Sequence, residues 1–158
     1  MKHTKILILI FCFIIKLIYS YKLLTTLNHT SAVFTILNIK FSNQEYSLNY
    51  LASGSQDLKI WDIKDRKLKF SFDESNGGHL VGVNKLEILE NGFVASASDS
   101  VKIWDLKDGK LKYTFDQSNG GHSNGISSLV SLENGYLASG SYDKTIKIWD
   151  LRNGKIEV

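Results

Sequence analysis

A pattern that occurs three times along the chain restricts the possible fold more than any other feature of the sequence. It reads NYLASGSQDLKIWD at residues 49–62, NGFVASASDSVKIWD at residues 91–105 and NGYLASGSYDKTIKIWD at residues 134–150. The Trp-Asp pairs that end the three copies are separated by 43 and 45 residues. An internal repeat of this length indicates an architecture built from stacked copies of one structural unit.

Each copy is predicted to contain two strands joined by a tight turn. In residues 145–150, the apolar Ile146 and Ile148 alternate with Lys147 and Trp149. Because successive side chains of a strand point to opposite faces, this alternation predicts a strand rather than a helix. Asn-Gly and Asp-Gly pairs, which adopt positive φ at low cost, occur between such strands elsewhere in the chain.

A Gly-His pair recurs in step with this pattern, at residues 78–79 and 121–122, which are 43 residues apart. Gly-His followed by Trp-Asp at a period of ~40–45 residues is the signature of one four-stranded propeller blade. From Tyr21 to Val158 the chain therefore resembles the WD-repeat (WD40-type) β-propeller family. The resemblance implies an all-β fold, a partial β-propeller of about three four-stranded antiparallel blades, with repeats at approximately residues 28–72, 78–115 and 121–158.

Residues 1–20 are predicted as a hydrophobic leader that precedes the propeller segment at residues 21–158. A basic start is followed by an apolar run over residues 6–15. This run has the length of a signal-peptide core but is short for a membrane-spanning helix. The bulky Ile18 and Tyr19 do not form the small-residue pattern of a cleavage site.

Three interpretations of this leader stay open: a cleaved signal peptide, an uncleaved short anchor, or a strand of a degraded blade. If the leader is genuine, the protein is expected in the secretory pathway or at a membrane, which it would contact through residues 6–19. Otherwise it is expected in the cytoplasm.

Charge and cysteine content exclude two further classes. The net charge of +3 arises from the first 22 residues, which hold four lysines and no acid, whereas the rest of the chain carries 15 basic and 16 acidic residues. A body of nearly balanced charge offers no basic surface for nucleic acid. Cys12 is the single cysteine, so no disulfide forms within one chain. No ligand spacing of a known metal or cofactor site is present, and neither is expected.

Each repeat contains a histidine, a serine, an aspartate and a tryptophan, a combination that imitates a catalytic triad. The family resemblance implies instead that these residues form a structural hydrogen-bond chain within a blade. A nucleophile that recurs at a regular period is poorly explained as catalysis. The chain is therefore predicted not to be an enzyme, and a hydrolase that uses one of these sets is the least favoured alternative. The sets are His29, Ser53, Asp57 and Trp61; His79, Ser96, Asp99 and Trp104; and His122, Ser139, Asp143 and Trp149.

The spacing between aspartate and tryptophan differs among the three sets. Asp143 precedes Trp149 by six residues, which is the common spacing in the family. Asp99 and Asp57 precede their tryptophans by only five and four residues. The shortened turns predict that Asp57 and Asp99 do not reach their histidine partners.

The predicted function is that of a non-enzymatic scaffold, built from WD repeats, that binds a protein or peptide. In the family, partners commonly contact the face that carries the Gly-His loops and the residue before each turn aspartate. Tyr142 is the preferred anchor, because an exposed aromatic side chain can dominate binding; packing of its ring on a neighbour explains it equally well. The candidates carried across are Gln56, Ser98 and Tyr142 in the turns and Leu80, Val81, Ser123 and Asn124 in the loops.

Three repeats are fewer than the ~4–8 blades of a typical propeller. Because a blade needs neighbours on both of its faces, two apolar faces would stay exposed. The chain is therefore expected either to be a fragment of a longer propeller or to complete a ring with blades from another copy. A membrane-tethered or lumenal structural protein is the alternative if the leader is genuine.

Overall fold

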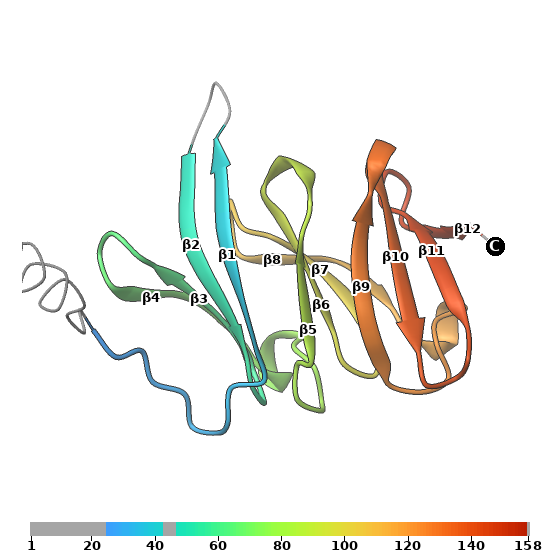
Figure 1. Ribbon diagram of the computed structural model, residues 1–158, viewed down its shortest axis with the longest axis horizontal. Coiled ribbons are helices and arrows are strands. Elements are labelled where there is room, and N and C mark those ends of the chain that lie inside the picture. The colour runs from blue at the N-terminus through green and yellow to red at the C-terminus, as the bar shows by residue number, and fades with distance from the viewer. Residues whose placement is uncertain (1–24, 43–46, 158) are drawn as a thin grey trace, which may run out of the picture.

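The computed structural model of the protein describes residues 25–42 and 47–157, which form three antiparallel sheets of four strands each (Figure 1). In every sheet the strands are hydrogen-bonded in their order along the chain. The first sheet contains β1 (Thr35–Ser42), β2 (Ser47–Gly54), β3 (Leu58–Asp62) and β4 (Lys67–Phe72). The second contains β5 (Lys85–Ile88), β6 (Phe93–Ala97), β7 (Val101–Asp105) and β8 (Lys110–Phe115). The third contains β9 (Ile126–Leu132), β10 (Tyr136–Ser141), β11 (Ile146–Asp150) and β12 (Lys155–Glu157).

The predicted leader at residues 1–20, including its proposed membrane segment at residues 6–19, lies outside the described residues. Within the two described ranges, no helix has the length and apolar character needed to cross a membrane. The signal-peptide, anchor and degraded-strand interpretations therefore stay predictions.

A repeated turn carries the chain from the last strand of one sheet toward the first strand of the next. Asp116 caps the 3-10 turn η3 (Gln117–Asn119): its carboxylate accepts from a backbone N–H two residues further on (2.9 Å). The side-chain oxygen of Asn119 accepts in return from the backbone N–H of Asp116 (3.0 Å). Gly120 follows with φ 88°, in the left-handed region that glycine adopts without strain. The same arrangement occurs at residues 73–77.

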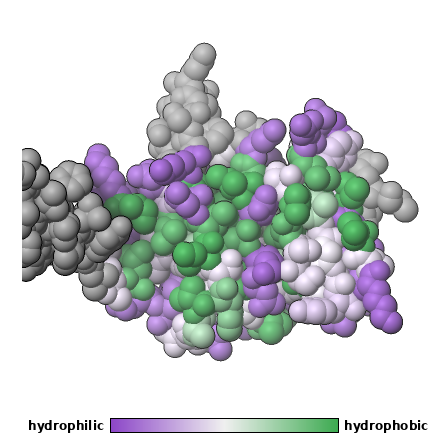
Figure 2. All heavy atoms as spheres, viewed as in Figure 1, coloured by the Kyte–Doolittle hydropathy of each residue, from purple (hydrophilic) through white to green (hydrophobic). Residues whose placement is uncertain are grey.

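The hydrophobic core lies between the sheets, in two layers. The first strands β1, β5 and β9 are neighbours across the middle of the molecule (Figure 1). Hydrophobic residues gather over this region on the face that Figure 2 shows. The layer between the first and second sheets contains Ile39, Ala52, Leu58, Ile60, Phe72, Val83, Leu86, Val94, Trp104 and Leu106. The layer between the second and third contains Leu89, Ala95, Ala97, Val101, Ile103, Phe115, Ile126, Leu137 and Trp149.

Stacked aromatic rings join each sheet to the next. Phe72, the last residue of β4, stacks on Trp104 of β7 with ring centroids 4.2 Å apart. Phe115, the last residue of β8, stacks on Trp149 of β11 at 4.5 Å. Such pairs contribute about 0.5–1.5 kcal/mol beyond the burial of their area. The tryptophan of each Trp-Asp pair in the second and third sheets thus anchors its sheet to the preceding one.

The third sheet has a free apolar face. Ile148 pairs with Ala138 in the same register in which Ile60 pairs with Ala52 in the first sheet. Ile60 is fully buried by the second sheet, whereas Ile148 is 38% exposed and Ile146 is 77% exposed. The equivalent apolar positions of β3 and β11 are therefore covered by a neighbouring sheet in the first sheet and exposed to solvent in the third.

Candidate functional site

The histidine set of the third sheet forms a continuous hydrogen-bond chain. His122 Nδ1 lies 2.7 Å from Asp143 Oδ2, and His122 Nε2 lies 2.8 Å from Ser139 Oγ. The indole N–H of Trp149 donates to the same Ser139 Oγ over 2.8 Å. Because the Asp143 carboxylate can only accept, the Nδ1–H of His122 donates to it, and in this tautomer His122 Nε2 accepts a hydrogen bond from the Ser139 hydroxyl. The donors thus run in one direction from the tryptophan to the aspartate.

Asp143 is held ionised by several donors. Burial alone would raise its pKa, but hydrogen bonds from the Thr145 hydroxyl and from His122 hold the pKa well below its usual range. The backbone N–H groups of Thr145 (2.9 Å) and Ser123 (3.1 Å) also donate to the carboxylate. One carboxylate therefore ties together the Gly-His loop and the turn between β10 and β11.

The set of the first sheet is also closed, which corrects one prediction. His29 Nδ1 lies 3.0 Å from Asp57 Oδ1, and His29 Nε2 lies 2.6 Å from Ser53 Oγ. Trp61 Nε1–H donates to Ser53 Oγ over 2.7 Å. The expectation that Asp57 does not reach its histidine is wrong, because His29 lies on an irregular segment before β1 that brings the ring to the shortened turn.

In the second set, the aspartate is displaced, as its spacing predicts. His79 Nε2 lies 2.8 Å from Ser96 Oγ, which also accepts from Trp104 Nε1–H at 2.8 Å. Asp99 Oδ1 is 3.6 Å from His79 Nδ1, too far for a hydrogen bond, and its side chain is half exposed. The hydroxyl of Ser100 lies between them, at 3.4 Å from Nδ1.

Without a close carboxylate, His79 is a neutral, buried imidazole. Burial lowers the pKa of His79 to about 4, and the nearby Lys102 ammonium adds to this effect, while Asp99 opposes it. Burial also lowers the pKa of Lys102. The neutral ring fits the hydrogen bonds, since its Nε2 can accept a hydrogen bond from the Ser96 hydroxyl while Trp104 donates to the same oxygen.

None of these arrangements presents a serine to a substrate. Ser53, Ser96 and Ser139 are 4%, 0% and 1% exposed. Each hydroxyl already accepts from a tryptophan and contacts a histidine. A nucleophile needs both its base and access to a carbonyl carbon. The geometry of the three sets suits the fixing of neighbouring strands and does not suit nucleophilic attack.

Six of the seven predicted binding residues are exposed at the Gly-His end of the sheets. Leu80, Val81 and Tyr142 are 72%, 59% and 71% exposed. The ring of Tyr142 lies against Gly125, whose carbonyl accepts from the Tyr142 backbone N–H at 3.0 Å. The polar residues Gln56, Ser123 and Asn124 are exposed as well.

The seventh residue, Ser98, does not lie on this surface, which corrects the prediction. It is 2% exposed, and its hydroxyl donates to the carbonyl of Val81 over 3.1 Å. Its backbone N–H donates to the carbonyl of Ser100, and its own carbonyl accepts from Ile126 N–H. Ser98 and Ser100 of this short turn are therefore buried by the neighbouring loops.

Two exposed apolar residues at the same end were missed. Val33 and Phe34 are 48% and 58% exposed, just before β1. The Phe34 ring lies so close to Gly82 that a Cβ added to that glycine would come within 2.8 Å of it. The signal in the sequence was that Val33 and Phe34 form an apolar pair between His29 and β1. Strand alternation alone assigns this pair to the strand and not to an exposed loop.

An open polar depression of about 700 Å³ lies beside the Gly-His loop at residues 121–125. Asp99, Asp116, Ser123 and Asn124 are among the residues that line it. The Asp116 carboxylate is occupied by the backbone and hydroxyl of Ser118. In the part of the chain that the structure describes, no three His, Cys, Asp or Glu side chains are grouped to hold a metal ion. That the protein takes no metal or cofactor stays a prediction.

Comparison with known proteins identifies the architecture. Residues 109–150 match the family model described as WD domain, G-beta repeat. Three similar solved structures are described as RRP9 WD40 repeats, with a TM-score of 0.69 and 17% identity; U3-55K, with 0.68 and 17%; and the WD40 beta propeller domain of Doa1, with 0.66 and 24%. Each match covers 83% of this chain, and this chain spans only 39–41% of those structures. No curated protein sequence matches the chain.

Proposed function

We propose that this chain, which carries a WD40 repeat and has the fold of a partial WD40 β-propeller, is a non-enzymatic scaffold for a protein or peptide partner. This fold is typical of protein-interaction scaffolds and by itself specifies no activity. The observation that carries the proposal is the group of exposed apolar side chains at the Gly-His end, which we call the Gly-His face: Val33, Phe34, Leu80, Val81 and Tyr142.

The buried hydrogen-bond sets support the proposal, because they hold the loops of this face in place. Asp143 accepts from His122 on one loop and from the Ser123 backbone, and it directly follows Tyr142. A surface that is already ordered loses less conformational entropy when a partner binds. In this proposal, the His, Ser, Asp and Trp residues of all three sets are structural. The hydrolase alternative is disfavoured by the burial of the three serines.

The proposal is tested with peptides selected from a display library on the full chain. The dissociation constant of a selected peptide is measured by fluorescence anisotropy for the wild type and for Tyr142→Ala. Because exposed aromatic anchors dominate many interfaces, we expect at least about tenfold weaker binding, or about 1.4 kcal/mol.

The matched control is Leu68→Ala on β4, which is 48% exposed but lies away from the Gly-His face. This variant is expected to bind the peptide as the wild type does. Equal affinity of the wild type, Tyr142→Ala and a Leu80→Ala/Val81→Ser double variant would contradict the proposal, because the peptide would then bind elsewhere.

We also propose that a second copy of the chain covers the free face of the third sheet. Ile146, Val130 and Ile148 are 77%, 54% and 38% exposed there, at positions that the next sheet covers elsewhere in the chain. In the first sheet, Ile36 has the register of Leu86, a residue that packs against the preceding sheet, and it is 68% exposed. The two ends of the chain thus offer complementary halves of one inter-sheet contact. The membrane-tethered or lumenal alternative depends on residues 1–20 and stays a prediction.

A further inference from the structure

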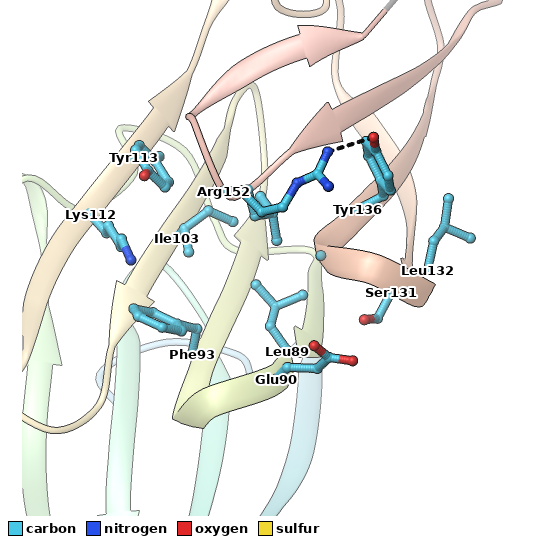
Figure 3. Close-up of a pocket in the computed structure, with 12 residues that line it drawn as sticks. Leu89, Glu90, Phe93, Ile103, Lys112, Tyr113, Ser131, Leu132, Tyr136 and Arg152 are labelled. Carbon is cyan, nitrogen blue, oxygen red and sulfur yellow. Dashed lines mark hydrogen bonds between the residues drawn. The ribbon is translucent and has the colours of Figure 1, made fainter.

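A second cavity lies between the second and third sheets, at the end opposite the Gly-His face. It has a volume of about 200 Å³, is partly open to solvent and is lined mostly by apolar and aromatic side chains (Figure 3). Phe93, Ile103 and Tyr113 of the second sheet line one side, and Leu132 and Tyr136 of the third line the other. None of these residues belongs to the hydrogen-bond sets or to the Gly-His face.

The register of the strands shows why the cavity exists at this junction. Ile88 pairs with Val94 in the second sheet as Ser131 pairs with Leu137 in the third, so Ile88 and Ser131 occupy equivalent positions. Between the first two sheets, the Ile88 side chain packs against the core together with Tyr50 and Phe70.

At the next junction, the shorter Ser131 leaves the corresponding volume unfilled. The residue that follows, Leu132, lies on the opposite face of β9 and is 37% exposed, whereas its counterpart Leu89 is covered by the third sheet and is 6% exposed. Ile88 and Ser131 therefore distinguish two otherwise similar junctions.

The size of the cavity limits what it can hold. Drug-sized ligands occupy pockets of roughly 300–1,000 Å³. An apolar cavity of about 150 Å³ is large enough to bind benzene. At about 200 Å³, this cavity has room for one aromatic ring or one branched aliphatic side chain, with aromatic walls on both sides.

The charged side chains at the rim of the cavity place a second requirement on the ligand. Lys112 Nζ lies 4.2 Å from the centre of the Phe93 ring and 5.6 Å from that of Tyr113. Among the ion pairs of the described residues, none includes Lys112. Arg152, the other cation of the cavity, is engaged: its guanidinium binds both carboxylate oxygens of Asp150 and donates to Tyr136 Oη at 2.6 Å. The ammonium of Lys112 is thus available to form an ion pair with a carboxylate of the ligand.

We propose that this cavity is a docking site for a peptide that inserts one aromatic or branched aliphatic side chain and places an adjacent carboxylate on Lys112. Glu90, which also lines the cavity, is drawn apart from Lys112 in Figure 3. A ligand carboxylate that pairs with Lys112 therefore lies away from Glu90. The Glu90 carboxylate can accept a hydrogen bond from a peptide N–H. The site is separate from the Gly-His face, so failure of one proposal leaves the other intact.

The test uses phenylacetate, the smallest probe that carries both an aromatic ring and a carboxylate. It is titrated into the full ¹⁵N-labelled chain, and amide shifts are followed by NMR. We expect saturable shifts at Ser131, Leu132 and Lys112, with a dissociation constant about two- to fivefold lower than that of benzyl alcohol, which lacks the charge. In Lys112→Gln, the two probes are expected to bind equally.

The two equivalent positions supply matched variants. Ser131→Ile fills the cavity as Ile88 does at the other junction, and it is expected to abolish the shifts. Ile88→Ser is expected to create a second set of shifts around Tyr50 and Phe70. Unchanged indole N–H signals of Trp104 and Trp149 show that each variant is folded. Shifts that persist in Ser131→Ile, or that map elsewhere in the wild type, would overturn the proposal; if that variant does not fold, equal affinities for the two probes in the wild type would overturn it.

Discussion

His79 shows how the surroundings of one side chain set its protonation and, through it, the stability of the sheet. Its side chain is fully buried, accepts a hydrogen bond from the Ser96 hydroxyl and lies near the ammonium of Lys102. His29 and His122 each have an aspartate within 3.0 Å, whereas Asp99 is 3.6 Å from His79. The longer distance to its aspartate thus separates His79 electrostatically from its counterparts in the first and third sheets.

This difference predicts a pH dependence of stability. The pKa of His79 is about 4 in the folded protein and about 6.5 in the unfolded chain. Between these pH values, the unfolded state therefore binds a proton at His79 that the folded state does not bind. The stabilisation is complete above about pH 6.5 and is lost as the pH falls toward 4, by up to about 1.4 kcal/mol per pH unit. The urea midpoint, measured between pH 7 and 5, is expected to fall in the wild type.

His79→Gln keeps a polar group at this position but does not titrate. Its urea midpoint is expected to be lower at pH 7 and to change less between pH 7 and 5. Parallel curves for the wild type and the variant would contradict a depressed pKa of His79.

At the scale of the elements, the turns that lead from one sheet to the next are encoded locally. The sequences DESNGG and DQSNGG give the same capped 3-10 turn, with Gly77 and Gly120 at φ 87° and 88°. The hydroxyl of Ser118 lowers the pKa of Asp116, so the cap is charged at neutral pH. These turns lead the chain from the last strand of one sheet into the Gly-His loop that follows.

Asp116→Ala is therefore expected to lower the free energy of unfolding by about 1 kcal/mol, the usual effect of removing an N-cap. The measurement is urea denaturation followed by tryptophan fluorescence. Gln117→Ala in the same turn, where the side chain is exposed, is the control and is expected to change stability by less than about 0.5 kcal/mol. An equal loss in both variants would mean that the cap contributes nothing specific.

At the scale of the whole molecule, the second-copy proposal rests on exposed apolar side chains of the first sheet (Ile36) and of the third (Val130, Ile146 and Ile148). Two copies joined head to tail through both contacts would form a ring of six sheets, within the roughly 4–8 blades of known propellers. Such a contact uses different surfaces on the two partners, and it remains finite only because the ring closes.

Light scattering after size-exclusion chromatography tests this association. The wild type is expected to have the mass of a dimer, and Ile146→Lys/Ile148→Lys the mass of a monomer, because two charges would be buried without partners. Leu68→Lys, on an outermost strand, is the control and is expected to leave the dimer intact. A monomeric wild type, or a double variant of unchanged mass, would contradict the second-copy proposal.

Much of this architecture follows from the sequence by itself. Strand alternation and Asn-Gly and Asp-Gly turns predicted strands and hairpins, and the resemblance carried by the repeat implied three four-stranded antiparallel blades; the fold and the WD40 repeat are confirmed. These features are local or periodic, so each is set by residues within one repeat. The residues of the three sets recur at the same period, and the resemblance implied their hydrogen bonds, which are complete in the first and third sets and lack the aspartate in the second.

What only the tertiary structure decided depends on contacts between segments far apart in the chain. Asp57 reaches His29 across 28 residues, although the spacing to Trp61 argues against it. Ser98 is buried because loops from two neighbouring segments cover its turn. The cavity at Ser131 appears only when the third sheet packs on the second. The periodicity of the sequence predicts the face of the strand on which a side chain lies. The space and the charges around that side chain are determined by the neighbouring sheet.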